Sequence, residues 1–240
     1  MPRKEPLELI PMLGRRDEVK ALLAAVKSCQ SRLIIGPAGI GKTRFLEECI
    51  AGSEQRVVRV EQPLVLHHLL VCLAEQLGCR SLRYSSAAGA TSMHLKPLVL
   101  NALRANPAVV VVEDLESRDP RMYRFLQELY HIPGASLIVT ARSMDWIGYV
   151  RKLLWDPREK IEMKPLSRTE SIELFEHAAR IFRLDSIDLN DFRNKVMEAA
   201  HGNPGKMIAM CRLATQPEYR RGRHIKFLPL RMDMLSAFVS

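Results

Sequence analysis

GPAGIGKT, residues 36–43, is the stretch of sequence that decides the fold. It matches the pattern G-x-x-x-x-G-K-[ST] at every fixed position, in which a glycine-rich loop curls its backbone N–H groups around a phosphate. The Lys42 ammonium then reaches the outer phosphates, and the Thr43 hydroxyl takes one position around Mg²⁺. We therefore expect the phosphates to contact Gly36, Pro37, Ala38, Gly39, Ile40, Gly41, Lys42, Thr43 and Arg44.

The residues on either side of this loop favour the same interpretation. Leu33-Ile34-Ile35 is apolar and short, as expected for a buried strand. Residues 43–51 have apolar side chains at helical spacing, so we predict a helix whose positive end faces the bound anion. A strand, the loop and then a helix is the setting that this motif requires.

The rest of the N-terminal part alternates predicted strands with predicted helices. Such alternation predicts a parallel sheet flanked by helices. The further predicted strands are residues 57–60, 108–112, 135–140 and 160–163, and the further predicted helices are 15–27, 64–77, 92–104, 121–131 and 144–154.

The pattern changes to helices alone after Lys164-Pro165. Ser167 and Glu170 form a capping-box sequence that opens a helix to about Phe182. Two more helices follow at 190–200 and 205–214. We predict an α/β domain over residues 1–165, a small helical domain over 166–215, and a basic and apolar C-terminal tail over 216–240.

Composition places the chain among reduced, globular proteins. It has 240 residues, of which 47% are hydrophobic, enough for a packed core. The five cysteines form no C-x-x-C pair, so we predict free, mostly buried thiols and neither disulfides nor a zinc site. Residues 1–5 have no apolar stretch, so we expect no leader sequence. No uncharged apolar run approaches membrane-spanning length, so we expect no membrane span. We expect a cytoplasmic protein without a membrane partner.

A triphosphate site also needs a carboxylate at the end of a neighbouring strand, to hold the metal shell and polarise water. The run Val109-Val110-Val111-Val112-Glu113-Asp114 supplies two carboxylates there. We assign Glu113 to the metal side and Asp114 to the general base, so that Thr43, Glu113 and Asp114 are the predicted Mg²⁺ ligands. The usual order of the two acids is reversed, which suggests slow hydrolysis.

The next predicted strand ends in Thr140-Ala141-Arg142. The Thr140 hydroxyl is suited to orient an attacking water. The Arg142 guanidinium is suited to a charge-assisted hydrogen bond with the last phosphate. Both join Lys42, Glu113 and Asp114 as predicted catalytic residues.

These segments resemble those of the AAA+/STAND group of P-loop ATPases. Residues 12–18 resemble the box before the phosphate loop, residues 36–43 the first Walker motif, residues 109–114 the second, and residues 139–142 the sensor. Residues 165–167 resemble the entry to the helical lid, and residues 201–204 the element whose proline abuts the nucleotide. The resemblance covers about residues 10–215.

The resemblance implies a five-stranded parallel P-loop NTPase sheet followed by an all-helical lid, with ATP or ADP and Mg²⁺ as cofactors. It adds Met12, Leu13, Gly14, Arg15 and Pro204 to the nucleotide-binding residues. Gly205 stands where many relatives carry a sensor arginine, which leaves Lys206 as a substitute. The implied activity is that of an ATPase switch that couples nucleotide state to homo-oligomer or partner assembly.

Two other functions stay open at this stage. The net charge of +9 and the basic run Arg220, Arg221, Arg223 and Lys226 suit a DNA-associated helper ATPase that contacts nucleic acid through its tail. The reversed acidic pair would also suit a nucleotide-binding scaffold that does not hydrolyse. The sequence does not exclude GTP, because adenine is favoured over guanine mainly by the resemblance. The guanine-reading motif N-K-x-D does not occur in the sequence.

Overall fold

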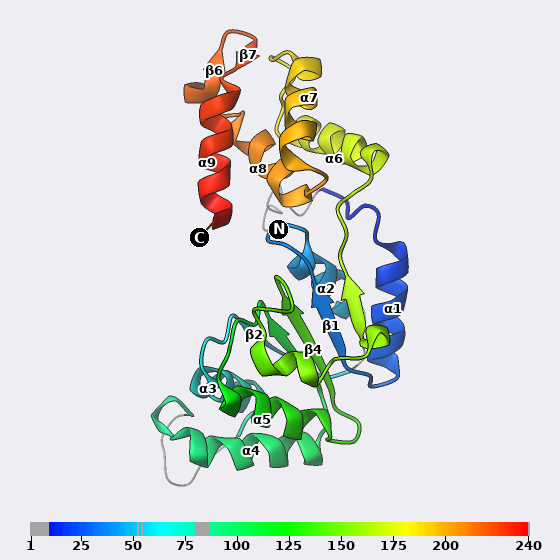
Figure 1. Ribbon diagram of the computed structural model, residues 1–240, viewed down its shortest axis with the longest axis vertical. Helices are drawn as coiled ribbons and strands as arrows, with labels where there is room; N and C mark the ends of the chain where they lie inside the picture. The colour runs from blue at the N-terminus through cyan, green and yellow to red at the C-terminus, as the bar shows by residue number, and fades with distance from the viewer. Residues whose placement is uncertain (1–9, 52, 54, 80–86, 240) are drawn as a thin grey trace. The chain divides into compact units, whose positions relative to one another are not determined.

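A computed structural model describes residues 10–51, 53, 55–79 and 87–239 (Figure 1). Residues 1–9 of the predicted first domain therefore lie outside the described part. The chain divides into two compact units. One, the α/β unit, comprises Arg16–Pro37 and Lys42–Met163; the other, the helical unit, comprises Lys164–Ser240 together with Ala38–Gly41 and the N-terminal segment to Arg15.

The α/β unit is built on a parallel five-stranded sheet flanked by helices, as the sequence predicts (Figure 1). The strand order is β2-β3-β4-β1-β5. Every residue of β3 and β4 is buried, because these β-branched strands are covered on both faces. The strands are β1 (Arg32–Ile35), β2 (Val57–Glu61), β3 (Val109–Glu113), β4 (Ser136–Ala141) and β5 (Lys160–Glu162).

The α-helices of this unit each bury one apolar face. They are α1 (Arg16–Lys27), α2 (Lys42–Ile50), α3 (Leu66–Leu77), α4 (Ser92–Ala105) and α5 (Pro120–Tyr130), with 3₁₀ turns η2 (Ala87–Gly89), η3 (Gly148–Lys152) and η4 (Pro157–Glu159). Helices α3, α4 and α5 pack on one another, and their apolar side chains form one core with β2, β3 and β4. Phe125 and Leu126 of α5 are fully buried in this core.

The predicted helix over 144–154 is wrong, since the structure forms only the 3₁₀ turn η3 there. Gly148 has a φ of +49°, which an α-helix does not allow. A Cβ at this position would also lie 2.9 Å from the Ser117 carbonyl oxygen. The close approach of the segment at Ser117 therefore needs glycine at position 148, and this glycine interrupts the helix.

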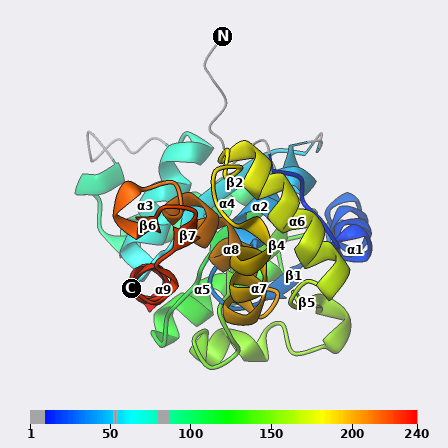
Figure 2. The ribbon, with the colours of Figure 1, turned by 90° about the horizontal axis from the view of Figure 1, so that it is seen from above.

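The helical unit contains α6 (Arg168–Ile181), α7 (Leu189–Ala200) and α8 (Pro204–Leu213), which Figure 2 shows grouped together. The predicted capping box is present, with Ser167 and Glu170 each bonding the other's backbone N–H. Its core includes Phe175 and Phe192, whose ring centroids lie 5.9 Å apart.

Residues 216–240, expected to be a basic and apolar tail, are folded over their described part. They form η5 (Pro217–Tyr219), the antiparallel strands β6 (Arg220–Arg221) and β7 (His224–Ile225), and α9 (Phe227–Val239). Tyr219, Ile225, Leu230 and Met234 are buried in the core of the helical unit. The Tyr219 hydroxyl also donates to Asp233 at 2.6 Å. The apolar residues of this segment are therefore structural.

Among the described residues, no helix combines the length and the apolar character that a membrane span would need. The five cysteines are free thiols, but they are not mostly buried as the sequence predicts. Cys49 and Cys211 are buried, whereas Cys29, Cys72 and Cys79 are half-buried. Burial raises the pKa of Cys49 to about 11 and that of Cys211 to about 12. These two thiols are accordingly poor nucleophiles in the folded protein.

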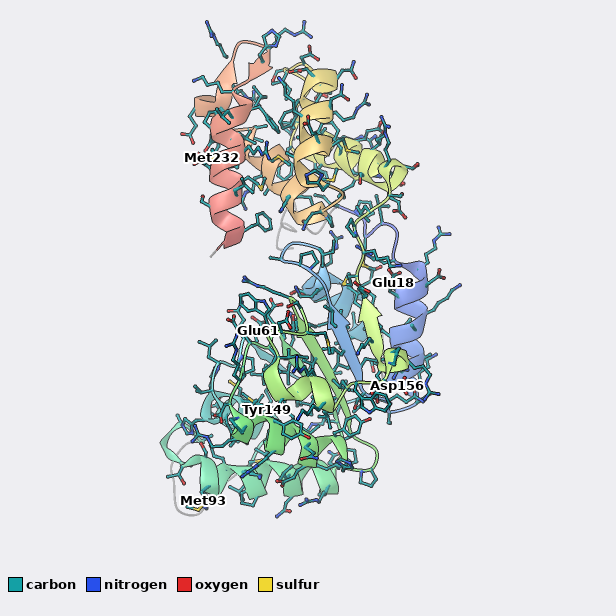
Figure 3. The ribbon with its side chains drawn as sticks, viewed as in Figure 1. Glu18, Glu61, Met93, Tyr149, Asp156 and Met232 are labelled. Atoms are coloured by element: carbon teal, nitrogen blue, oxygen red, sulfur yellow. The ribbon has the colours of Figure 1, made fainter. Side chains whose placement is uncertain are left out.

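Two methionines give a matched test of the core. Met122 of α5 is fully buried, whereas Met93 of α4 is 86% exposed (Figure 3). Met122→Ala should lower the free energy of unfolding by about 2–5 kcal/mol, because it leaves a cavity. Met93→Ala should change it by less than about 0.5 kcal/mol. Urea unfolding followed by circular dichroism measures both, and equal losses would contradict the packing described here.

Candidate functional site

The glycine-rich loop adopts the backbone that its sequence predicts. Gly39 and Gly41 have φ angles of +76° and +98°, a region that favours glycine. The Gly36 N–H donates to the Ala141 carbonyl at 3.2 Å, which anchors the start of the loop to the end of β4. The loop thus begins at the carboxyl edge of the sheet, where ligands bind in open α/β folds.

Lys42 begins α2 and is buried, with 6% of its surface exposed. Its Nζ donates to the Gly36 carbonyl at 3.0 Å and to the Pro37 carbonyl at 3.5 Å. The same ammonium lies 3.3 Å from Asp114 Oδ1. A buried ammonium is costly unless it is paired, so these oxygens hold the charge in place.

Glu113 ends β3 and is buried next to the start of α2. The Thr43 hydroxyl donates to its Oε2 at 3.1 Å. Burial raises the pKa of Glu113 above its ordinary value, although hydrogen bonds from Arg59 and Thr43 work in the opposite direction. The side chain is 4% exposed.

Arg59 is a residue that the motif search missed. It lies in β2 and its Nε donates to Glu113 Oε1, forming an ion pair. Its terminal nitrogens also lie 3.4 Å from Glu47 and 3.7 Å from Glu61. A charged residue in the middle of the strand VVRVE was the available sequence signal, because such a residue needs a partner.

Asp114 follows β3 with a φ of +43°, an uncommon conformation for a residue other than glycine. The Asp114 N–H donates to Thr140 Oγ1 at 2.8 Å, and the Leu115 N–H donates to the Thr140 carbonyl at 2.8 Å. Thr140 therefore fixes the turn that presents Asp114. Its own side chain is 1% exposed.

Arg142 follows β4, and its guanidinium lies over the ring of Trp146, 5.4 Å from the centroid. This is a cation–π arrangement within the loop that leaves the strand. The five predicted catalytic residues thus come from the start of α2 and the carboxyl ends of β3 and β4. Lys42, Asp114 and Thr140 are linked by direct contacts, whereas Arg142 contacts Trp146.

Within the helical unit, the tip of the loop is held by the start of α8. The Asn203 side-chain amide donates to the Ala38 carbonyl at 2.9 Å, and the Gly205 N–H donates to the Gly39 carbonyl at 2.8 Å. Asn203 Oδ1 also accepts from the Lys206 N–H and so caps α8. A Cβ on Gly205 would lie 2.7 Å from Gly39 Cα, so this approach needs glycine at position 205.

In the sequence, Gly205 stands where many relatives carry a sensor arginine. Its close packing against Gly39 explains why glycine is needed at this position. The C-terminal helix reaches the same place, since a Cβ on Gly39 would lie 2.5 Å from the Phe238 ring. Pro204 is the first residue of α8. Asn203 lies within the 201–204 element noted in the sequence, although that element does not predict its bond to Ala38, and no sequence motif predicts the contact of Phe238 with the loop.

The segment before α1 also belongs to the helical unit. Leu13 packs against the core of that unit. Gly14 has a φ of +66° and lies against the Glu170 carboxylate, so closely that a Cβ would overlap it. The Arg15 guanidinium donates to the Lys164 carbonyl. The remaining predicted nucleotide-binding residues of this segment and of α2 are Met12 and Arg44, which are half-buried.

The residues present fit a Mg²⁺ ion that is completed by phosphate. No cluster of three or more His, Cys, Asp or Glu side chains suited to a metal occurs among the described residues. Mg²⁺ in triphosphate sites commonly needs only one or two carboxylates, with waters and phosphates as its other ligands. The Thr43 hydroxyl and the Glu113 carboxylate meet at 3.1 Å, and Asp114 Oδ1 is buried without a hydrogen bond of good geometry.

Comparison with known proteins identifies the fold. No protein-family model matches the sequence, and no curated protein matches it. Among solved structures, a Walker-type ATPase of Pyrococcus abyssi is 13% identical, with a TM-score of 0.64 over 94% of this chain and 72% of that one. The ORC1 protein of Aeropyrum pernix, solved in complex with DNA, is 15% identical, with a TM-score of 0.62 over 98% and 69%.

A third structure is the STAND protein with a tetratricopeptide repeat sensor from Pyrococcus horikoshii. It is 16% identical, with a TM-score of 0.53 over 99% of this chain and 34% of that chain. These similarities show that the chain has the fold of P-loop ATPases of the AAA+ and STAND kind. At such low identity they show the fold alone.

The ion pair of Arg59 and Glu113 can be tested by stability. Arg59→Ala should lower the free energy of unfolding by about 1.5–3 kcal/mol, because a buried carboxylate loses a charged hydrogen bond. Arg59→Ala combined with Glu113→Gln should recover part of the loss, giving a coupling energy of about 0.5–3 kcal/mol. Guanidinium unfolding measures the cycle.

Arg56→Ala is the control, since Arg56 is exposed just before the same strand and should change stability by less than about 0.5 kcal/mol. Additive effects of Arg59→Ala and Glu113→Gln would contradict the pairing.

Proposed function

We propose that the chain is a Mg²⁺-dependent ATPase that hydrolyses ATP slowly and uses the change of nucleotide as a switch. The observation that carries this proposal is the arrangement of Lys42, Thr43, Glu113 and Asp114. A buried ammonium, a hydroxyl and two carboxylates meet next to a glycine-rich loop in the fold of P-loop ATPases. This set supplies a cation for phosphates, a metal site and a base.

In the proposed mechanism, loop amides and the Lys42 ammonium hold the phosphates of ATP. Thr43 and Glu113 would hold Mg²⁺, which neutralises charge on the phosphates. When the phosphates draw the Lys42 ammonium toward them, Asp114 loses its cationic partner and becomes free to accept a proton from the attacking water. The Thr140 hydroxyl keeps Asp114 in position by accepting a hydrogen bond from the Asp114 N–H. Because Thr140 is buried, this role is favoured over direct contact of its hydroxyl with the attacking water.

The switch would act through the tip of the phosphate loop. The Ala38 and Gly39 carbonyls accept hydrogen bonds from Asn203 and Gly205, at the start of α8. A change in the loop on binding or losing the last phosphate would therefore be transmitted to α8 by these bonds. The change in the helical unit is proposed to govern assembly with a second copy or another protein.

Substitution of the two central residues separates binding from chemistry. Lys42→Ala should abolish ATP binding, because it removes the cation that faces the phosphates. Asp114→Asn should keep ATP binding and slow phosphate release by about 100-fold or more, since it removes the base. Calorimetry with Mg²⁺ and ATP and a phosphate-release assay measure the two effects.

Lys27→Ala, at the exposed end of α1, is the matched control and should behave as the unchanged protein. ATP binding by Lys42→Ala at unchanged affinity would refute the assignment. Binding without any phosphate release in the unchanged protein would instead favour the scaffold that does not hydrolyse.

Asn203→Asp tests the connection to α8. Aspartate caps a helix as well as asparagine does, but it cannot donate to the Ala38 carbonyl. In the unchanged protein, Mg²⁺ and ATP should alter the hydrogen exchange of residues 204–213. In Asn203→Asp this response should be weakened, because only the Gly205–Gly39 bond still joins the loop to α8. Circular dichroism establishes that the variant folds.

Asn190→Asp, at the exposed start of α7, is the control and should keep the response. An unaltered response in Asn203→Asp would show that the loop does not signal through this bond.

A nucleic-acid-associated helper ATPase is the second candidate function. It is supported by the basic hairpin of β6 and β7, in which Arg221 and Arg223 are exposed. Two of the four cations predicted to bind nucleic acid have structural bonds instead: Arg220 donates to the Ala214 carbonyl and Lys226 to the Glu218 carbonyl. The similarity to an ORC1 protein solved with DNA agrees with this candidate at the level of fold.

A further inference from the structure

A row of exposed side chains lies on η3 and the turn before it, in the α/β unit. Trp146, Tyr149 and Lys152 are spaced three residues apart. Side chains at this spacing eclipse one another on a 3₁₀ helix, so Tyr149 and Lys152 share one face of η3, and Trp146 lies in the turn that precedes it. Trp146 is 39% exposed, and Tyr149, which Figure 3 labels, is 48% exposed. We call this row the η3 face.

Both aromatic rings of the η3 face are held by neighbouring groups. Arg142 lies over the Trp146 ring and Lys152 over the Tyr149 ring, each 5.4 Å from the centroid. Tyr123 of α5 lies 6.3 Å from Tyr149. Ile147 and Val150, which alternate with the exposed residues, are buried and anchor the turn. The rings are therefore fixed on the surface and pre-organised for contact.

A hollow of about 290 Å³ lies beside Trp146. Its lining is Glu116, Ser117, Arg118, Asp145 and Trp146. The Ser117 N–H donates to the Trp146 carbonyl at 3.1 Å, so the strap after β3 forms a fixed wall. The volume is at the lower end for small-molecule pockets, which suits one planar group the size of a base.

We propose that the η3 face binds single-stranded nucleic acid. One base stacks in the hollow on the Trp146 face that Arg142 leaves open, and a neighbouring base stacks on the Tyr149 face that Lys152 leaves open, as bases do on aromatic rings in single-strand sites. Arg118 lines the hollow, Lys152 lies over Tyr149, and Arg151 is exposed on η3. These three cations provide positive charge for the phosphates. Glu116 and Asp145 accept hydrogen bonds from the amino group of a base, which favours cytosine over thymine.

The mixture of charges selects this occupant. A double-stranded segment keeps its bases stacked inside, so it leaves the two rings without partners. An acidic peptide meets the Glu116 and Asp145 carboxylates in the hollow, which repel it. The exposed cations match an anionic part of the ligand, whereas the rings and the two carboxylates match an aromatic part that carries an amino group. A single strand of nucleic acid has both parts.

This inference does not depend on ATP binding at the phosphate loop. It shares with the second candidate function only the premise that nucleic acid is a partner, and it places the contact on η3 instead of the basic hairpin. The two are distinguishable because Trp146 and the hairpin arginines are substituted separately.

Fluorescence anisotropy with labelled 15-nucleotide dC and dT strands tests the proposal. The full chain should bind dC more tightly than dT, and raising the salt concentration should weaken both. Trp146→Ala should weaken dC binding roughly 5- to 150-fold, the range expected for loss of one stacked base. Trp155→Ala is the control, because Trp155 is 70% exposed but makes no contact with the hollow, and it should bind as the unchanged protein does.

The far-ultraviolet circular dichroism of each variant is compared with that of the unchanged chain, to establish that Trp146→Ala folds. Tyr149→Ala serves as a second variant with the same expected loss. Equal binding by Trp146→Ala and the unchanged chain would overturn the proposal. So would binding that is lost only in Arg221→Ala with Arg223→Ala, or an equal affinity for polyglutamate.

Discussion

The pairing of the buried Lys42 ammonium with oxygen atoms is the constraint on which the rest of the site depends. With 6% of its surface exposed, this cation needs partners, and it finds them in Asp114 and in the carbonyls of Gly36 and Pro37. These groups fix the start of the loop relative to the end of β3. Thr140 in turn fixes the unusual backbone of Asp114.

The same constraint gives the two acidic residues different surroundings. Glu113 is enclosed by Thr43 and Arg59 and is buried enough for its pKa to rise. Asp114 faces Lys42 and is partly exposed. Glu113 is thus the more enclosed of the two adjacent acids, and Asp114 is the more open one. Arg59, which belongs to none of the sequence motifs, forms the ion pair that holds Glu113.

The fold could be predicted from the sequence because strong local patterns agree. The β-branched run over 109–112 and the loop of residues 36–43 each determine their own structure, and the parallel five-stranded sheet is confirmed. Gly148 and Phe238 could not be interpreted in this way. Gly148 interrupts a helix because it lies against the backbone of Ser117 and Arg118, about 30 positions earlier. Phe238 contacts Gly39, almost 200 positions away. Roles that the sequence assigns to individual site residues stay predictions.

The most direct test is an experimental structure with Mg²⁺ and a non-hydrolysable ATP analogue. The Lys42 ammonium should have moved from Asp114 to the outer phosphates, with the metal between the phosphates and the side chains of Thr43 and Glu113. A nucleotide bound elsewhere, with Lys42 still 3.3 Å from Asp114, would contradict the proposed site.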